Sequence, residues 1–334
     1  MSDPKRILSG MQPTNERLHL GNYEGALRNW VELQEIYKLY CCVVDWHALT
    51  TMADDPAQIA RNSKEIAKDY IAAGIDPAKS TVFIQSHVKE HAELHLIFSM
   101  ITPLGWLERV PTYKEKQQTV GTEREAYGLL GYPVLQAADI LLYKPYGVPV
   151  GRDQAPHLEL SREIGRRFNR LYGEVFPEFA NIIPEDELRA KVPGLDADDD
   201  GRLRKMSKSY DNCIYLSDTA DETAAKIKGA FTTPTKMRKT DPGVPEGCAV
   251  CQLLRLYSPN WQIQWEEDRQ GIRGCMQNKS EFIEVLNEHL RPIRERRAAI
   301  GDADIDAILR KGAQEAREFA AQTMDEVRLA MHFV

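Results

Sequence analysis

Two stretches of the sequence carry residues suited to holding a triphosphate. The first is an apolar segment and polar loop, residues 7–14, followed by His19-Leu20-Gly21-Asn22, where a helix is predicted to begin. A helix N-terminus presents unpaired N–H groups and the positive end of the helix dipole, which favour phosphate. His19 and Asn22 add side-chain donors, and Gly21 lacks a Cβ, so a flat base would fit against its backbone. The same pattern also fits an ordinary strand-to-helix turn.

The second stretch is the basic loop Lys205-Met206-Ser207-Lys208-Ser209, far downstream. Such a loop is otherwise usually solvated surface. Residues 190–212 around it are polar and contain flanking glycines and a run of aspartates. This composition predicts a mobile loop that also serves as a hinge between two domains.

The elements that position these stretches alternate along the chain. Apolar segments at 39–45, 81–85 and 147–150 alternate with helical periodicity at 21–36, 56–73 and up to about 172. This order predicts an α/β fold with a doubly wound, Rossmann-like parallel sheet, interrupted by a helical insertion at about 87–145. Ligands of such sheets bind beyond the carboxyl ends of the strands.

Beyond the basic loop the chain is predicted to be helical. Helical periodicity covers about 219–230, 246–257, 279–299 and 303–332, and the last of these is amphipathic. We therefore expect a catalytic domain at 1–205 and an α-helical C-terminal domain at 206–334, whose last helix could pack back on the first domain.

Composition bounds the class of protein. The chain has 334 residues, 43% of them hydrophobic and 28% charged, which is typical of a globular protein of about two domains. No apolar run reaches transmembrane length, and residues 1–6 lack the apolar segment of a signal peptide, so we expect a cytoplasmic protein. The net charge of −7 excludes a surface that binds nucleic acid everywhere, but it leaves room for a local basic patch. Two arginine clusters are candidates, or are ordinary solvated helix faces: Arg162, Arg166, Arg167 and Arg170, and Arg291, Arg294, Arg296 and Arg297.

Histidine and cysteine raise the question of a metal. His87, His91 and His95 would share one face of a helix and could bind zinc. The residue after His91 is alanine, whereas a zinc hydrolase requires glutamate there, and we predict no metal site. The six cysteines are expected to be reduced thiols, with Cys41 and Cys42 in the core of a strand.

Taken together, the two phosphate-type stretches closely resemble the paired signature sequences of the class I aminoacyl-tRNA synthetases. Further segments resemble the tryptophanyl-tRNA synthetases, so the resemblance covers nearly the whole chain; these segments are 45–50, 107–109, 132–143, 151–154 and 157–159. The chain departs from the family in the loop 13–19, which is one residue longer and lacks a glycine, so the placement of His19 is open.

The resemblance implies a tryptophan–tRNA ligase. Such an enzyme activates L-tryptophan with ATP and Mg²⁺ to tryptophanyl-adenylate and transfers it to the terminal ribose of tRNA(Trp). It implies a homodimer joined through the insertion, an anticodon-binding C-terminal domain and no membrane association. A carboxylate attacks the α-phosphate in the first step, so the protein must supply alignment and charge neutralisation more than proton transfer.

The resemblance also assigns residues. Lys205, Lys208, Lys116 and His19 would act on the phosphates. The whole ATP site would contain Gln12, Pro13, Thr14, Gly21, Asn22, Gly151, Arg152, Asp153, Val192, Lys205, Met206, Ser207, Lys208 and Ser209. The tryptophan site would contain Asp139, Tyr132, Gln154, Gln12, Gly10, Val44, His47, Val148 and Val150. In it, Asp139 would accept the indole N–H, although an ion-paired helix acid is the alternative, as a satisfied core histidine is for His47.

Other interpretations stay open. A tyrosyl-tRNA synthetase shares the architecture, a non-catalytic tRNA-binding or regulatory relative would keep the fold, and another nucleotidyltransferase would make a small adenylate. Some relatives carry an iron–sulfur cluster on four cysteines. Here Cys248 and Cys275 match two positions, Cys251 is additional, and Asn278 replaces the last cysteine, so no cluster is expected.

Overall fold

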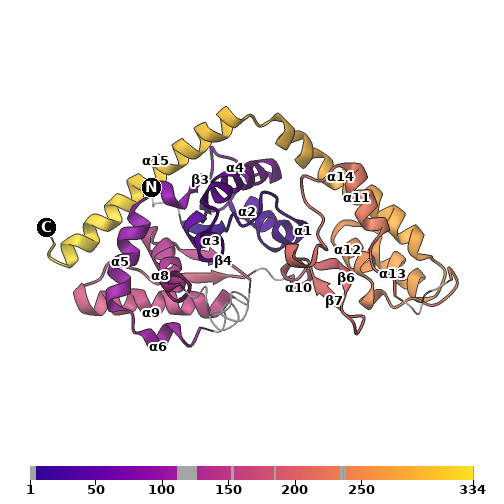
Figure 1. Ribbon diagram of the computed structural model, residues 1–334, viewed down its shortest axis with the longest axis horizontal. Helices are drawn as coiled ribbons and strands as arrows, with labels where there is room; N and C mark the ends of the chain where they lie inside the picture. The colour runs from indigo at the N-terminus through magenta and orange to yellow at the C-terminus, as the bar shows by residue number, and fades with distance from the viewer. Residues whose placement is uncertain are drawn as a thin grey trace.

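The structure, a computed structural model, describes residues 5–110, 126–151, 154–183, 186–233, 236 and 238–333. A five-stranded parallel sheet with the order β3-β2-β1-β4-β5 forms its centre (Figure 1). The strands are β1 (Arg6–Met11), β2 (Lys38–Val43), β3 (Thr81–Ile84), β4 (Gly147–Pro149) and β5 (Ala180–Ile182). The predicted doubly wound sheet is confirmed; β5, which is short and half exposed, was not predicted.

Strand β1 is the centre of the sheet and the point where the chain changes direction. It pairs with β2 from Arg6–Lys38 to Met11–Val43, and on its other side Ile7 pairs with Gly147 of β4. The chain therefore leaves β1 toward one edge first and fills the other edge later. In sheets of this kind ligands bind at the carboxyl end of the strand where the order reverses, which here is the end of β1.

The helices of the sheet region cover both of its faces. They are α1 (Leu20–Asn22), the π-helix η1 (Tyr23–Leu27), α2 (Arg28–Leu33), α3 (Asp45–Met52), α4 (Pro56–Ala73), the 3-10 turn η2 (Gln85–His87), α5 (Glu90–Ile101), α6 (Leu104–Leu107), α8 (Tyr127–Leu142) and α9 (Ala155–Tyr172). Asp55 caps α4 by accepting the Gln58 N–H, and Gly74 ends it with a φ of 120°. The first helical segment ends at Leu33, earlier than the predicted residue 36.

Side chains of a strand point alternately to opposite faces, so the sheet feeds two core layers. One layer contains Ile7, Leu39, Cys41, Val43, Val82 and Ile84 with Trp30, Ile66 and Tyr70 from the helices. The other contains Leu8, Tyr40, Cys42 and Phe83 with Phe98, Tyr143, Leu158 and Ala316. Cys41 and Cys42 are fully buried in opposite layers, which confirms that they are core residues.

The later part of the chain begins with a hairpin and continues with helices. The hairpin strands β6 (Pro193–Ala197) and β7 (Leu203–Lys205) are antiparallel, so the prediction that 190–212 is wholly loop is wrong over these strands. The other elements are α10 (Glu187–Ala190), the 3-10 turns η5 (Lys208–Tyr210) and η6 (Pro245–Gly247), and α11 (Ala220–Lys228), α12 (Ala249–Tyr257), α13 (Trp261–Arg269), α14 (Cys275–Ala299) and α15 (Asp302–Ala330). Helix α13 was not predicted.

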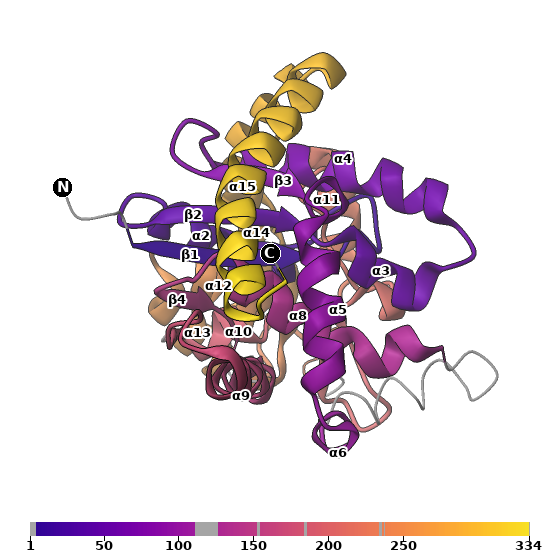
Figure 2. The ribbon, with the colours of Figure 1, turned by 90° about the vertical axis from the view of Figure 1, so that its left-hand side faces the viewer.

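Helix α15 runs back over the sheet. Figures 1 and 2 show α14 and α15 as an arch whose last helix crosses the sheet region beside β3 and α5. A Cβ at Gly312 of α15 would lie 1.9 Å from the carbonyl oxygen of Val82, so only glycine allows this approach. Within the described ranges, no helix has the length and apolar character needed to cross a membrane.

Candidate active site

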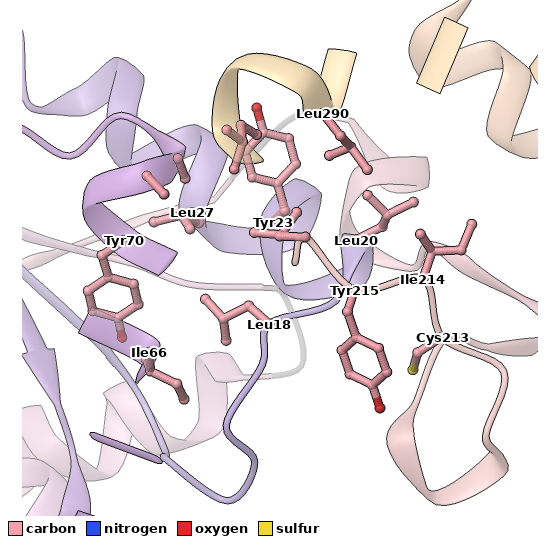
Figure 3. Close-up of a cluster of buried hydrophobic side chains, with 14 of the residues drawn as sticks. Leu18, Leu20, Tyr23, Leu27, Ile66, Tyr70, Cys213, Ile214, Tyr215 and Leu290 are labelled. Carbon is pink, nitrogen blue, oxygen red and sulfur yellow. The ribbon is translucent and has the colours of Figure 1, made fainter. Parts of the chain in front are cut away.

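The first loop and the segment that follows the lysine loop are joined by backbone hydrogen bonds. The N–H of Leu20 donates to the Ile214 carbonyl at 2.9 Å, and the N–H of Leu216 donates to the Leu18 carbonyl at 2.8 Å. Figure 3 shows Leu18 and Leu20 beside Ile214 and Tyr215. Residues far apart in the sequence are thus brought together at the start of the first helix.

Backbone and side-chain hydrogen bonds hold the base of the lysine loop. Met206 is buried, and its N–H donates to the Val192 carbonyl at 2.9 Å, so these two predicted ATP residues anchor the loop. The N–H of Ser207 donates to the side chain of Asn212 at 2.8 Å, and the Asn212 amide donates to Asp196 at 2.6 Å. The loop is therefore braced against the hairpin by one buried asparagine.

The two motifs contact each other directly. Lys208 Nζ donates to the Thr14 carbonyl at 2.6 Å. A Cβ at Gly21 would lie 2.9 Å from the His19 ring and 3.6 Å from Met206 Cβ. A side chain at position 21 would therefore crowd the His19 ring, whereas its contact with Met206 would be an ordinary van der Waals contact.

A cavity of about 290 Å³ lies between the motifs. Five of the predicted ATP residues line it, together with His19; the five are Gln12, Thr14, Asn22, Ser207 and Lys208. Pro13 is behind the wall, where its carbonyl accepts from Asn62 at 2.9 Å. Lys205 and Ser209 are exposed outside the cavity, and Gly151 lies in the neighbouring cavity. Lys116, Arg152 and Asp153 are outside the described residues.

In this region the histidine and the lysines differ in their charge at neutral pH. Burial, together with the charges of Lys205 and Lys208, lowers the pKa of His19 to about 4. Burial also lowers the pKa of Lys208. His19 is therefore neutral near pH 7 and can make hydrogen bonds but carries no charge. Positive charge for a triphosphate comes from the lysines.

A second cavity, of about 410 Å³, opens at the carboxyl ends of β1 and β4. All nine predicted tryptophan residues line it: Gly10, Gln12, Val44, His47, Tyr132, Asp139, Val148, Val150 and Gln154. A Cβ at Gly10 would lie 2.6 Å from the Cys42 carbonyl oxygen, so this wall needs glycine. Gln12 lines both cavities and marks the place where they meet.

Asp139 is buried and accepts three hydrogen bonds. Its donors are Gln85 Nε2 at 2.7 Å, His47 Nε2 at 2.8 Å and His91 Nδ1 at 2.7 Å. Burial by itself would raise the pKa of Asp139, but the hydrogen bonds and charges of His47 and His91 outweigh it and lower the pKa to about 2. The group is an ionised acceptor with lone pairs left over for a ligand N–H, because a carboxylate has about four acceptor sites.

Gln85 and His91 are residues of this site that the sequence did not reveal. Gln85 directly follows β3. Its position at the carboxyl end of a strand is the sequence feature that could have indicated a site residue. One ring nitrogen of His91, Nδ1, contacts Asp139. The other, Nε2, lies 2.9 Å from the Tyr143 hydroxyl.

The idea of three histidines on one helix face is wrong. His87 belongs to η2 and is exposed, whereas α5 starts at Glu90. No group of three or more potential metal ligands occurs in the part of the chain that the structure describes.

The cysteine group in the C-terminal helices does not fit a four-cysteine cluster. Asn278 stands in the fourth position, and its Nδ2 donates to Asp268 at 2.9 Å and to Cys251 Sγ at 3.5 Å. Lys236 Nζ donates to the same Asp268 at 2.9 Å. The space between these groups is about 10 Å³. A buried ion pair and an amide fill the region.

Most of the predicted basic-patch arginines are bonded within the chain. Arg166 pairs with Glu178, and Arg297 pairs with Asp69 and with Glu65, both at 2.6 Å. The two ion pairs of Arg297 join α14 to α4. In this structure these guanidinium groups therefore serve packing between elements.

The fold, the two converging motifs and the paired cavities are those of a class I synthetase. A model of the family described as tRNA synthetases class I (W and Y) matches residues 1–291. A tryptophan–tRNA ligase from Thermotoga maritima is 46% identical over 336 residues, covering 98% of this chain and 99% of the relative. One from Aquifex aeolicus is 41% identical over 402 residues, with coverage of 98% and 99%.

A solved structure gives the same result. Tryptophanyl-tRNA synthetase from Campylobacter jejuni, complexed with ADP and tryptophan, is 32% identical, with a TM-score of 0.85 and coverage of 98% of this chain and 99% of that one. The chain belongs to the class I tRNA synthetases for tryptophan and tyrosine, and within them to the tryptophanyl-tRNA synthetases.

Proposed function

We propose that this protein ligates L-tryptophan to tRNA(Trp) in two steps, with tryptophanyl-adenylate as the intermediate. The observation that carries the proposal is that the two cavities are neighbours, since Gln12 lines both. One cavity ends in a buried carboxylate, and the other is bordered by Lys208 and a helix N-terminus. An amino acid in the first cavity would have its carboxylate beside the α-phosphate of ATP in the second. The Campylobacter jejuni relative holds ADP and tryptophan.

The first step needs placement and charge compensation. The tryptophan carboxylate oxygen attacks the α-phosphorus, the bond to the bridging oxygen of the β-phosphate breaks, and pyrophosphate leaves. ATP enters as its magnesium complex, which shares the charge of the phosphates. Lys208 would exchange its bond with the Thr14 carbonyl for a phosphate oxygen, and Lys205 would follow on the same loop. His19, neutral, would donate or accept a hydrogen bond.

Selection of the amino acid would depend on Asp139. Its three donors fix the carboxylate, and an indole N–H would satisfy one of its remaining acceptor sites. Phenylalanine would leave that acceptor unpaired, and sites built around a substrate donor reject analogues lacking it strongly. Tyr132, Gln154 and Gln12 would hold the amino and carboxylate groups.

The deciding experiment is ATP–pyrophosphate exchange measured with each of the protein amino acids. Exchange driven by tryptophan alone is expected. Exchange driven by tyrosine would indicate a tyrosyl enzyme; the tyrosyl-tRNA synthetase of Archaeoglobus fulgidus shares the fold at 21% identity. No exchange with any amino acid would favour a non-catalytic relative, and exchange with tryptophan without charging of tRNA would remove the second step.

The assembly that fits the exposed surface is a homodimer in the cytoplasm, joined through the insertion. Large apolar side chains are exposed on α5, α6 and the start of α8, with exposed fractions of 56% for Leu96, 75% for Met100, 63% for Leu104 and 65% for Tyr127. The C-terminal helices would then bind the anticodon of a tRNA that spans both subunits, by stacking and edge contacts.

Replacing Met100 by glutamate tests this surface. The glutamate charge would have to be buried in the dimer interface, so the variant should sediment as a monomer. Its circular dichroism spectrum should remain helical. Ile263→Glu, on exposed helix α13, is the matched control and should remain dimeric. A dimeric Met100→Glu protein would place the interface elsewhere.

A further inference from the structure

The start of α12 carries a pair of cysteines that the proposed reaction does not use. Cys248 caps the helix, and Cys251 follows in its first turn. Cys248 Sγ accepts a hydrogen bond from the backbone N–H of Cys251 at 3.3 Å. Cys248 is half-buried, whereas Cys251 is buried, with 4% exposed. The two thiols lie together, and one of them is nearer to solvent.

The two thiols differ in acidity. A hydrogen bond from the Cys251 thiol lowers the pKa of Cys248, and the backbone N–H of Cys251 acts in the same direction. The hydrogen bond to Cys248 and burial raise the pKa of Cys251. Thiolates at helix N-termini are stabilised, and the thiolate is the nucleophile in disulfide exchange. Cys248, half-buried at the helix cap, is placed to be the attacking thiol, and the buried Cys251 is placed to be the resolving thiol.

The backbone allows the two sulfurs to bond. Residues three apart on a helix have Cβ atoms roughly 5–6 Å apart, and a disulfide needs about 3.5–4.5 Å. Cys248 has φ −101° and ψ 115°, outside the helical region. Rotation of this cap residue can close the gap without unwinding the body of α12.

We propose that Cys248 and Cys251 form a redox-active dithiol, oxidised to a disulfide by a low-molecular-weight disulfide such as glutathione disulfide, and that this modification changes the hairpin carrying the lysine loop. The chemical part stands independently of the enzyme's reaction. The effect on catalysis rests on the function proposed above.

The reaction is ordinary thiol–disulfide exchange. The Cys248 thiolate attacks one sulfur of glutathione disulfide, a mixed disulfide forms, the glutathione S–S bond breaks, and one glutathione leaves and takes up a proton. Cys251 then loses its proton and attacks the Cys248 sulfur, releasing the second glutathione. Two protein thiols are oxidised and one glutathione disulfide is reduced to two thiols, so atoms and electrons balance.

Helix α12 connects the dithiol to the lysine loop. It packs against β6, and its residues Val250 and Leu254 share a core with Val192 and Met206, which hold the base of the loop. Cys251 Sγ also accepts from Asn278 of α14 at 3.5 Å. Closing the disulfide changes this contact and moves the first turn of α12 against the hairpin.

The first experiment measures the bond. The full-length protein is equilibrated in buffers of reduced and oxidised glutathione, free thiols are alkylated, and peptides are mapped by mass spectrometry. A Cys248–Cys251 disulfide is expected, reversed by reduced glutathione. Failure of both thiols to oxidise in excess glutathione disulfide would overturn the proposal, and so would a bond to Cys275.

Two variants sharpen the measurement. Cys275→Ser keeps the pair and should oxidise like the wild type. Cys251→Ser should stop at the mixed disulfide of Cys248 with glutathione, because the resolving thiol is absent. If Cys251→Ser fails to fold by circular dichroism, Cys248→Ser replaces it and should leave Cys251 unmodified.

The second experiment measures transmission. Hydrogen–deuterium exchange of peptides covering 193–209 is compared in the reduced and oxidised wild type, with Cys275→Ser as the control that should respond equally. A severalfold change in exchange rate is expected on oxidation, with a parallel change in ATP–pyrophosphate exchange. Identical hydrogen exchange in both states would overturn the coupling; altered hydrogen exchange without any pyrophosphate exchange would instead contradict the proposed function.

Discussion

The two cavities are built in different ways. The 410 Å³ cavity lies at the carboxyl ends of the central strands of one sheet, and its key carboxylate is held by three buried donors. The 290 Å³ cavity lies between two segments from distant parts of the chain, joined by a few backbone bonds and one lysine contact. The proposed amino-acid site is thus preorganised, whereas the proposed phosphate site is assembled from two segments with few contacts between them. Loops that complete a site in this way often control the rate of turnover.

The largest expected effect comes from breaking the preorganised cavity. Asp139→Asn removes the charge that the buried donors surround and exchanges an acceptor for a donor. We expect kcat/KM for tryptophan to fall on the order of 10³-fold, because disrupting a buried charge network costs about 3–5 kcal/mol. The KM for ATP should change little. Steady-state pyrophosphate exchange with each substrate varied gives both values.

Asp199→Asn, an exposed change of the same type, controls for the loss of one carboxylate. Equal losses for tryptophan and ATP in Asp139→Asn would show that the two cavities are not separate in function.

A change in the assembled cavity should slow adenylate formation and leave tryptophan binding intact. Lys208→Ala removes a charge from the wall of the nucleotide cavity and the bond to Thr14. Adenylate formation should slow by about 10²-fold, the usual effect of removing one group that stabilises transition-state charge. The dissociation constant for tryptophan, measured by calorimetry, should stay near its wild-type value.

Lys191→Ala, at an exposed lysine outside the cavity, should leave the rate unchanged. A large rise in the tryptophan dissociation constant of Lys208→Ala would count against its assignment to phosphate.

A smaller effect is expected from crowding the start of the first helix. Gly21→Ala places a methyl group 2.9 Å from the His19 ring, so the ring or the helix start must shift beside the proposed nucleotide cavity. Overpacking of this kind costs about 1–3 kcal/mol, and we expect a severalfold rise in the KM for ATP. Gly105→Ala, where a Cβ meets nothing within 4 Å, should have no effect on KM. Matching KM values in both variants would show that glycine is not needed at position 21.

The smallest effect concerns pH and stability. His19 has a pKa of about 4 in the folded protein, below its ordinary value of 6.5. The unfolded chain therefore binds the proton more readily, and stability present above pH 6.5 is lost as pH falls toward 4. By this linkage, the wild type should lose on the order of 2 kcal/mol more than His19→Gln between pH 7.5 and 5.

Urea unfolding at both pH values measures the difference. His332→Gln, near the exposed end of α15, should behave like the wild type. Equal pH dependence in wild type and His19→Gln would show that His19 is charged in the folded protein.

Sequence patterns predicted the strands, the long helices and the convergence of the two motifs because each depends on local periodicity or on a contiguous signature. The residues supporting Asp139 depend on tertiary packing instead. Gln85 and His91 lie on elements distant from α8 in the sequence, and neither the strand-end position of Gln85 nor the histidine spacing around His91 indicates a contact with Asp139. The hairpin β6–β7 was missed because glycine and aspartate dominate it, and its pairing depends on the chain on either side.

The path of α15 bears on how the protein is made. This helix supplies Ala313, Ala316, Ala320, Met324 and Val327 to the layer that covers one face of the sheet. Chains begin to fold from their N-terminal end during synthesis. Here α5, α8 and α9 cover much of that face early, whereas the part beside β3 waits for α15. A nascent chain on the ribosome would thus expose the apolar surface beside β3 to chaperones until α15 has been synthesised.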